Sequence, residues 1–484
     1  MKRIFLLILL AGCAVGPKYK QPETALPQTF EQQKQTFEEV NISSWWKQFD
    51  DVYLELLIEE AIRDNYDMKL AAEKIRELRA FYRAESSSLY PSLQMNASAN
   101  RSRRSPNVSE APVDSTGTSV DTFENFFSGP LFQNFFQVGL DASWELDLFG
   151  KNRRRSQAAR QDMEAGIEQM HAVQVVLAAD VAFSYLEIRT LQERIHLQKR
   201  RIERQQELLK LSEALLDAGL SSDIDVEIQR AQLETLIQDV HTLEIAFKQR
   251  IFFLATLLGK QPEGFARRFE TITPIPYAED RLPASMPSEM VRRRPDLRRA
   301  ERELAAATSR IGVAVADLFP SFSLLGSFGF QSNKPNNLFD WASRFWQVGP
   351  SMLWSLFEGG RLRAQVKIQT SLQKQALLRY EQTVISSLEE VESSLAAYFE
   401  EQNRLKSIEQ KQIAEELLVK YATDRFTSGL TGAQEVLEAE NVLTQTQQIL
   451  IDSRQRLMMD LVALYKALGG GWPYMGCESE YGAK

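Results

Sequence analysis

Two carboxylates are the clearest candidates for chemistry in the second half of the chain. Glu435 and Glu438 are three positions apart in a segment predicted to be helical, so their side chains share one face of that helix. Most glutamate pairs of this kind belong to a solvated helix surface, so the spacing alone does not define a charged site. The three histidines (His171, His196 and His241) form no cluster of metal ligands and no nucleophile–base pair. The sequence therefore predicts neither a cofactor nor an enzyme.

A second reactive residue, Cys13, follows a short N-terminal leader. Two basic residues precede an apolar run from Ile4 to Leu10, which is typical of a secretory signal and too short to span a bilayer. The sequence Leu-Ala-Gly-Cys at 10–13 resembles a bacterial lipobox, which implies cleavage before Cys13 and lipid on its thiol and new amino group. The alternative is an ordinary signal with an unrelated cysteine. Ala14 is not the aspartate that retains many such lipoproteins in the inner membrane, so the resemblance implies the outer membrane. If Cys13 is acylated, Cys477 has no disulfide partner within the chain.

Long elements must position these residues. Apolar and polar residues alternate from Gln137 to Leu148, which predicts a half-buried strand. No proline occurs between Pro130 and Pro262, so a helix can run from Asn152 to about Asp217. We expect this helix to turn sharply at Gly219-Leu220 and to return as a second helix.

The same pattern recurs 210 positions later. Trp144 matches Trp354 (354 − 144 = 210), and the turn Gly219-Leu220 matches Gly429-Leu430. Five apolar heptad positions of the first returning helix correspond to five of the second at the same offset: Val226, Leu233, Val240, Phe247 and Leu254 to Val436, Leu443, Leu450, Leu457 and Leu464. Phe319-Pro320-Ser321 repeats Tyr90-Pro91-Ser92 at an offset of 229. These matches predict an internal duplication.

The duplication gives the predicted domain boundaries. They are a signal peptide (1–12), a lipid-anchored linker (13–44), a first repeat (45–261), a connector (262–287), a second repeat (288–470) and a C-terminal tail (471–484). We expect each repeat to contain a helix, two strands and a long helical hairpin. The predicted first helix covers Asp51 to Glu85, and the predicted strands cover 93–100, 137–148, 322–330 and 347–356.

The alternating segments have the length of transmembrane strands, about 9 to 12 residues. A soluble sheet explains any one of them, and an intramolecular coiled coil explains the heptads alone. No segment beyond the leader approaches 18 consecutive apolar residues, which favours strands over helices as the spanning part. Four strands cannot close a barrel, so we expect three copies to supply twelve strands. The net charge of −8 argues against nucleic acid as a partner.

The ordered set of motifs resembles the TolC family, the outer-membrane channels of bacterial tripartite efflux and secretion systems. It is most similar to the lipoprotein branch paired with multidrug pumps of the RND type. The matching residues are Leu-Ala-Gly-Cys at 10–13, Arg-Pro-Asp-Leu at 294–297, Phe-Pro-Ser at 319–321, Trp-Ser-Leu-Phe at 354–357 and both Gly-Leu turns. The resemblance implies an α+β membrane protein: a homotrimer with a twelve-stranded transmembrane β-barrel, continued by a periplasmic α-helical barrel.

The resemblance also implies a function and partners. The chain is expected to be an exit duct in outer-membrane lipid, docked to a periplasmic adaptor and supplied by an inner-membrane transporter. One alternative is the outer-membrane component of a type I protein secretion system. A periplasm-spanning structural coiled-coil lipoprotein is another, and it predicts no alternating strands. A free-standing porin predicts many strands per chain and short helices.

Two sites follow from the resemblance. The turns would form the periplasmic tips that contact the adaptor, through Gly219, Leu220, Ser221, Ser222, Gly429, Leu430, Thr431 and Gly432. Three-fold symmetry would turn Glu435 and Glu438 into acidic rings that concentrate cations, with Asp225 in a hydrogen-bonded latch. The positions of the latch's tyrosine and arginine hold Phe426 and Thr431 here, so closure is expected to rest on apolar contacts among the tips.

Overall fold

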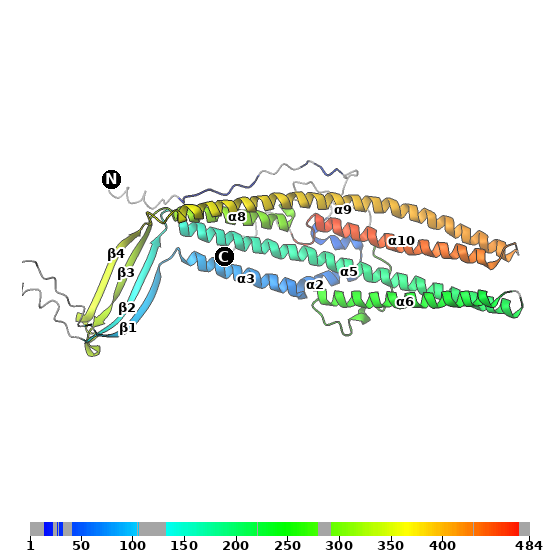
Figure 1. Ribbon diagram of the computed structural model, residues 1–484, viewed down its shortest axis with the longest axis horizontal. Helices are drawn as coiled ribbons and strands as arrows, with labels where there is room; N and C mark the ends of the chain where they lie inside the picture. The colour runs from blue at the N-terminus through cyan, green and yellow to red at the C-terminus, as the bar shows by residue number, and fades with distance from the viewer. Residues whose placement is uncertain are drawn as a thin grey trace, which may run out of the picture. The chain divides into compact units, whose positions relative to one another are not determined.

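A computed structural model describes residues 14–22, 27, 29–31, 41–103, 105, 132–219, 221–278, 292–428 and 430–473 (Figure 1). The signal peptide, Cys13, Leu220, Gly429 and Cys477 lie outside these residues. The chain divides into two compact units, which are described separately. The first contains Leu78–Asp162, Leu304–Ala376 and the N-terminal residues up to Lys20. The second contains Gln21–Glu77, Met163–Glu303 and the chain from Leu377 onward.

The helices confirm the predicted duplication. Helices α5 (Lys151–Asp217) and α9 (Arg361–Thr427) each have 67 residues, and the offset between them is 210 (361 − 151 = 210). Their return helices α6 (Asp223–Leu257) and α10 (Ala433–Ala467) each have 35 residues and the same offset. Two shorter helices, α3 (Tyr66–Ser87) and α8 (Pro295–Ala316), are related by 229 (295 − 66 = 229).

The strands repeat in the same way and form one antiparallel sheet of order β1-β2-β3-β4. Strands β1 (Ser92–Arg103) and β3 (Ser321–Ser332) are related by 229. Ser92 pairs with Ser143 of β2 (Phe132–Leu146), and Ser321 pairs with Leu353 of β4 (Arg344–Leu353). These two pairings place β4 at an offset of 210 from β2. The strand register therefore shows the same duplication as the helices, from an independent observation. Strands β1 and β4 are the edges of the sheet.

The prediction of one helix from Asp51 to Glu85 is wrong. The structure has two helices, α2 (Val52–Asp64) and α3, separated at Asn65. The Asn65 side-chain oxygen accepts hydrogen bonds from the backbone N–H groups of Asp67 (2.7 Å) and Met68 (3.1 Å). Asparagine in this role begins a new helix instead of continuing the old one.

The core of the second unit includes residues from outside the two predicted repeats. Ile42 of the predicted linker is buried, and it begins a 3-10 helix, η1 (Ile42–Phe49). In the same helix Trp45, the first residue of the predicted first repeat, stacks on Tyr465 at 5.5 Å between ring centroids. Phe269 lies in the connector, in the 3-10 helix η3 (Phe265–Phe269), and is buried. Trp472 of the predicted tail is also buried and stacks on His171 at 4.4 Å. Part of the linker, the connector and the tail therefore packs into the folded unit.

Within the described ranges, α5 is the one helix that is long and apolar enough to pass a composition test for a membrane span. Its most apolar 18-residue window is 61% buried inside the structure. Burial of this kind is typical of a core helix.

Candidate functional site

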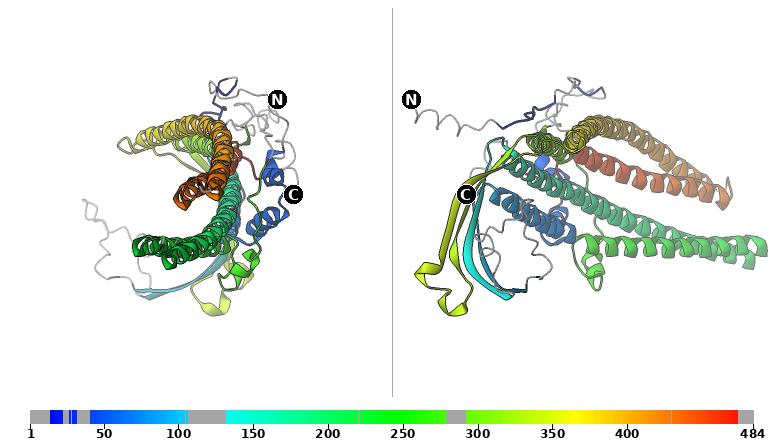
Figure 2. Two further views of the ribbon diagram at one scale, coloured as in Figure 1. Left: turned by 90° about the vertical axis from the view of Figure 1, so that its right-hand side faces the viewer. Right: turned by 60° about the vertical axis from the view of Figure 1, so that its left-hand side comes forward.

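The sheet has one exposed apolar row that crosses all four strands. Met95 pairs with Leu140, Leu140 with Phe328, and Phe328 with Trp346. All four side chains are exposed, Met95 by 71% and Trp346 by 70%. The sheet itself curves along its strands (Figure 2). An exposed apolar row of this kind suits contact with lipid better than contact with water.

The neighbouring row, one residue along each strand, is polar. It consists of Gln94, Asp141, Ser327 and Gln347, paired in the same order. Successive residues of a strand point to opposite faces, so the sheet has an apolar face and a polar face. This is the alternation of a membrane strand with lipid on one side and water on the other.

Two equivalent tryptophans fix the ends of the strands to the helices. The indole N–H of Trp144 donates to the backbone carbonyl of Leu89 at 3.1 Å. The indole N–H of Trp354 donates to the carbonyl of Leu318 at 3.2 Å. Both rings remain partly exposed, by 39% and 51%. An indole with an apolar body and a bonded N–H suits a membrane–water boundary.

The turn between α5 and α6 is closed by a capping box. The Ser222 hydroxyl accepts from the backbone N–H of Asp225, and the Asp225 carboxylate accepts from the backbone N–H of Ser222 at 3.1 Å. The hydroxyls of Ser221 (3.1 Å) and Ser222 (2.7 Å) donate to the same carboxylate oxygen. These bonds, those of Ser222 first, lower the pKa of Asp225. Asp225 is thus an anionic helix cap within its own turn.

The turn between α9 and α10 is closed differently. Its N-cap is Gly432, which offers no side-chain hydrogen bond. The backbone N–H of Leu430 donates to the carbonyl of Arg425 at 2.9 Å, which closes the end of α9. The Arg425 guanidinium then reaches across the turn and binds Glu435 at 3.1 Å.

The two predicted gate glutamates therefore have different side-chain partners. Glu435 is paired with Arg425, whereas Glu438 accepts a hydrogen bond from the Gln434 amide at 3.1 Å. Phe426 is 38% exposed, and the Thr431 hydroxyl has no hydrogen-bond partner among the described residues. Arg425 was not predicted as a site residue. The sequence signal for it is a basic residue just before the turn with an acidic residue ten positions later. A tight helical hairpin brings two such residues together.

Both hairpins are held by buried or half-buried polar contacts as well as by apolar heptads. In the first, the Gln205 amide donates to the Gln229 side chain at 2.8 Å. In the second, the Ser453 hydroxyl donates to the buried Glu401 carboxylate at 2.6 Å. Arg204 of α5 lies 3.7 Å from Glu440 of α10, so the two hairpins also contact each other. Of the five predicted heptad positions on α6, Val226, Val240 and Leu254 are buried, and Leu233 and Phe247 are half-buried.

The arrangement of a four-stranded sheet and two long helical hairpins agrees with one family profile, described as outer membrane efflux protein. The profile matches residues 57–260 and 286–470. The chain belongs to the outer membrane efflux protein family. This confirms the predicted resemblance.

Relatives within the outer membrane efflux protein family match this chain along nearly its whole length. The cation efflux system protein CusC of Escherichia coli is 30% identical over 470 residues, which is 96% of this chain and 97% of CusC. The solvent efflux pump outer membrane protein SrpC of Pseudomonas putida is 30% identical over 482 residues, 97% of each chain. The solved outer-membrane channel OprN has 33% identity and a TM-score of 0.86, and the match covers 95% of this chain and all of OprN. The predicted fold class is confirmed.

Proposed function

We propose that the protein is the outer-membrane exit duct of a tripartite efflux system. The observation that carries this is the two-faced sheet, which exposes Met95, Leu140, Phe328 and Trp346 in one row and has a polar row beside it. Such a sheet can line a water-filled bore with its polar face while its apolar face contacts lipid. Membership of the outer membrane efflux protein family supports the same location and role.

The duct requires more than one copy of the chain. Among the strands that the structure describes, β1 and β4 are the edges of the sheet, and the outer backbone groups of each have no neighbouring strand. Lipid offers these groups no hydrogen bonds, so the sheet must be closed by other copies. We propose a homotrimer, whose twelve strands form a closed barrel and whose long helices form the periplasmic continuation. Cys13 is proposed as the lipid attachment site that anchors each copy.

The duct is proposed to be passive and non-enzymatic. An inner-membrane transporter supplies the energy, and a periplasmic adaptor docks at the tips, through Gly219, Leu220, Ser221, Ser222, Gly429, Leu430, Thr431 and Gly432. Relatives are named for cation and for solvent efflux, so a duct of this family does not by itself define one substrate class. We therefore assign the choice of substrate to the transporter.

Glu435, Glu438 and Asp225 are proposed as the charged groups of the periplasmic gate. The Arg425 guanidinium offsets the charge of Glu435, whereas the side-chain partner of Glu438 is the neutral Gln434 amide, so Glu438 keeps its negative charge. Asp225 supports the gate by fixing the first turn through its bonds to Ser221 and Ser222. The gate is therefore expected to select cations, by a smaller margin than two unpaired glutamates would give.

Two measurements test this proposal. Liposomes that contain the purified protein should swell in small uncharged sugars, because a water-filled bore passes them; intact trimers that produce no swelling would contradict the duct. For the gate, the reversal potential in a salt gradient should shift toward zero in Glu438→Gln, and the shift should be smaller in Glu435→Gln. Glu440→Gln, which lies on the same helix and pairs with Arg204, is the matched control. Equal reversal potentials in all four proteins would exclude Glu435 and Glu438 from the gate.

A further inference from the structure

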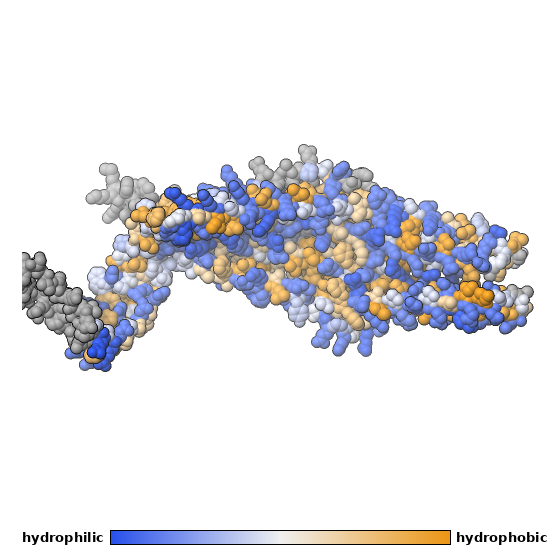
Figure 3. All heavy atoms as spheres, viewed as in Figure 1, coloured by the Kyte–Doolittle hydropathy of each residue, from blue (hydrophilic) through white to orange (hydrophobic). Residues whose placement is uncertain are grey.

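Three exposed arginines lie at the end of the sheet that is away from the starts of α5 and α9. Arg103 is the last residue of β1, Arg101 lies two residues before it, and Arg344 is the first residue of β4. All three are exposed. Hydrophilic residues gather at this end of the sheet (Figure 3). We call Arg101, Arg103 and Arg344 the arginine rim.

The arginine rim belongs to the apolar face of the sheet. Arg101 and Arg103 lie six and eight residues after Met95 on β1 (101 − 95 = 6; 103 − 95 = 8), and Arg344 lies two residues before Trp346 on β4. Residues separated by an even number along a strand point to the same face. The face that is proposed to contact lipid therefore ends in positive charge.

The rim and the boundary tryptophans are separated by the thickness of an apolar band. Trp354 follows Arg344 by ten residues (354 − 344 = 10), and Trp144 follows Asn134, the residue opposite Arg101, by ten (144 − 134 = 10). Ten residues of strand extend about 33 Å. A strand tilt of about 40° reduces this to about 25 Å across the membrane, which is the height of the apolar band on a transmembrane sheet. The tryptophans and the arginines thus mark its two boundaries.

Both repeats supply an arginine at this level, from different strands. Arg101 of β1 lies opposite Asn134 of β2. The duplication maps these positions onto Phe330 of β3 (101 + 229 = 330) and Arg344 of β4 (134 + 210 = 344), which also lie opposite each other. The arginine is on the first strand of one pair and on the second strand of the other, at the same pairing position. The two repeats therefore share the level of the positive charge.

Aromatic rings support the three arginine side chains. The guanidiniums of Arg101 and Arg103 lie 5.5 and 5.6 Å from the centroid of the Phe132 ring. The Arg344 guanidinium lies 4.4 Å from the centroid of the Trp341 ring and donates to the Trp341 carbonyl at 3.0 Å. A ring covers one face of a guanidinium and leaves N–H groups at its edge available to an anion.

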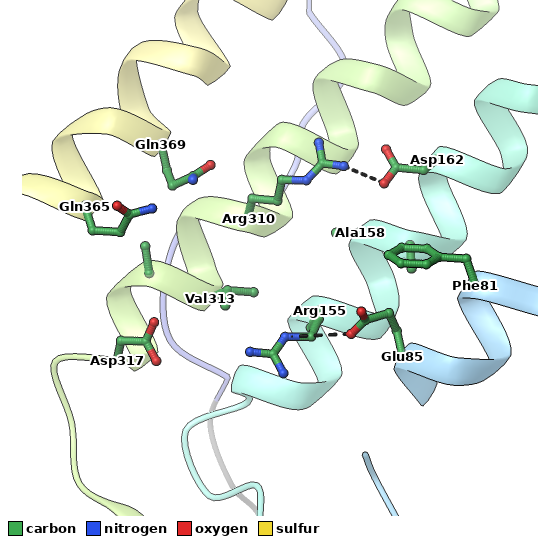
Figure 4. A pocket seen from close by; sticks show the side chains of 12 residues that line it. Phe81, Glu85, Arg155, Ala158, Asp162, Arg310, Val313, Asp317, Gln365 and Gln369 are labelled. Atoms are coloured by element: carbon green, nitrogen blue, oxygen red, sulfur yellow. Dashed lines mark hydrogen bonds and ion pairs between the residues drawn. The ribbon is translucent and has the colours of Figure 1, made fainter. Parts of the chain in front are cut away.

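Arginines near the helical end of the same unit have carboxylate partners instead. Arg310 forms an ion pair with Asp162, and Arg155 lies 3.8 Å from Glu85 (Figure 4). Among the described residues, no rim arginine forms an ion pair with a carboxylate. A positive charge on the lipid-facing side of a transmembrane sheet is tolerated near the membrane boundary, where it can meet charged headgroups. An anionic headgroup would supply the partner that the rim lacks in the described chain.

We propose that the arginine rim binds the phosphate groups of lipids in the outer leaflet of the outer membrane. The helices are proposed to lie in the periplasm, so the rim end of the sheet faces the outside. Arginine suits this ligand because its planar fork of N–H groups matches pairs of phosphate oxygens. A lipid fits better than phosphate in solution, because its acyl chains can cover the apolar face that adjoins the rim. The inference rests on the proposed membrane duct and adds the class of lipid that the duct recognises.

Lipid retention by the purified protein tests the proposal without a substitution. The full chain in neutral detergent is mixed with lipid A that carries two phosphates, washed on a column and analysed for bound lipid by mass spectrometry. We expect this lipid to be retained, and lipid A from which the phosphates have been removed to be retained about ten-fold less, because only the charged contacts are lost. Equal retention of the two lipids would overturn the proposal.

Substitutions assign the retention to the rim. The rim variant replaces all three arginines: Arg101→Gln, Arg103→Gln and Arg344→Gln. It should retain phosphorylated lipid A about ten-fold less than the native protein does. Lysine at the same three positions should give an intermediate value, because the charge remains and the planar fork is lost. The matched control removes three exposed positive charges from the long helices and should retain lipid as the native protein does: Lys210→Gln, Lys248→Gln and Lys420→Gln.

Liposome swelling separates this proposal from the proposed duct. The rim variant should still form trimers and allow small sugars to enter liposomes, because the rim is on the face of the sheet away from the bore. A rim variant that swells liposomes and retains as much phosphorylated lipid A as the native protein would overturn the phosphate site and leave the duct intact. Native protein that forms trimers but produces no swelling would contradict the duct, and with it the lipid-facing position of the rim.

Discussion

The uncapped start of α10 gives a quantitative prediction. Ser222 caps α6, and its counterpart in the second repeat is Gly432, which has no side chain to cap α10. Gly432 has φ −78° and ψ 163°, which suits any residue, and a Cβ added there meets nothing within 4 Å. Gly432→Ser therefore introduces a cap without strain, three residues before Glu435, as in a capping box.

The size of the effect follows from two contributions. A serine N-cap is better than glycine by a few tenths of a kcal/mol. Replacing glycine at a compatible backbone conformation contributes a further gain of about 0.4 to 1 kcal/mol, because the unfolded chain loses conformational freedom. The total of about 1 kcal/mol should slow opening of this turn about five-fold, since 1.36 kcal/mol corresponds to a factor of ten.

Hydrogen–deuterium exchange measured by mass spectrometry tests this value. Amides of residues 433–436 should exchange about five-fold more slowly in Gly432→Ser, whereas those of 223–226 should not change. Ser222→Gly is the converse control and should accelerate exchange only at 223–226. Unchanged or faster exchange at 433–436 in a folded Gly432→Ser protein would refute the capping argument. If opening of this turn gates the duct, the same variant should also lower the open probability.

Three further predictions concern single residues. Arg425→Gln should increase cation selectivity in reversal-potential measurements, because it removes the cation that offsets the charge of Glu435. Lys420→Gln is the control. Unchanged selectivity in Arg425→Gln would contradict the pairing of Arg425 with Glu435. Gly219 has φ +70°, so Gly219→Ala should destabilise the first turn by about 1 kcal/mol and accelerate amide exchange in that turn. Gly219→Asn should have a smaller effect on both, because asparagine tolerates a positive φ better than alanine does. Burial and the nearby Glu401 carboxylate raise the pKa of Asp460 to about 6 from its ordinary 3.8. The folded protein binds this proton more tightly than the unfolded chain, so the ionised carboxylate destabilises the fold above about pH 6, and the penalty disappears as the pH falls below 4. Asp460→Asn should therefore raise the thermal unfolding midpoint at pH 7.5 and have little effect at pH 4; a constant difference at both pH values would argue against this cause.

The sequence predicted the repeated elements because their signals are local. The uninterrupted helices follow from the absence of proline, and the matched Gly-Leu turns mark their ends. The break at Asn65 was missed because asparagine is tolerated inside a helix and becomes a cap only when its side chain bonds to the following N–H groups. Strand β2 begins at Phe132, five residues earlier than predicted, because pairing with β1 extends it beyond its alternating segment.

The site was predicted less completely than the fold. The acidic residues near the second turn were identified, but the Arg425–Glu435 pair depends on how tightly the turn brings two helices together. The apolar row from Met95 to Trp346 depends on strand register, which no single strand contains. The capping residue Ser222 was named as part of a tip, and its bond to Asp225 was not foreseen.

Copies of this chain are proposed to enclose a water-filled bore through a membrane. Single-channel recording of the purified trimer in planar lipid bilayers tests it most directly. We expect discrete current steps that are cation-selective and that disappear when the trimer is dissociated by heating. Intact trimers that insert into the bilayer and pass no current, with the periplasmic turns removed as well as present, would contradict it.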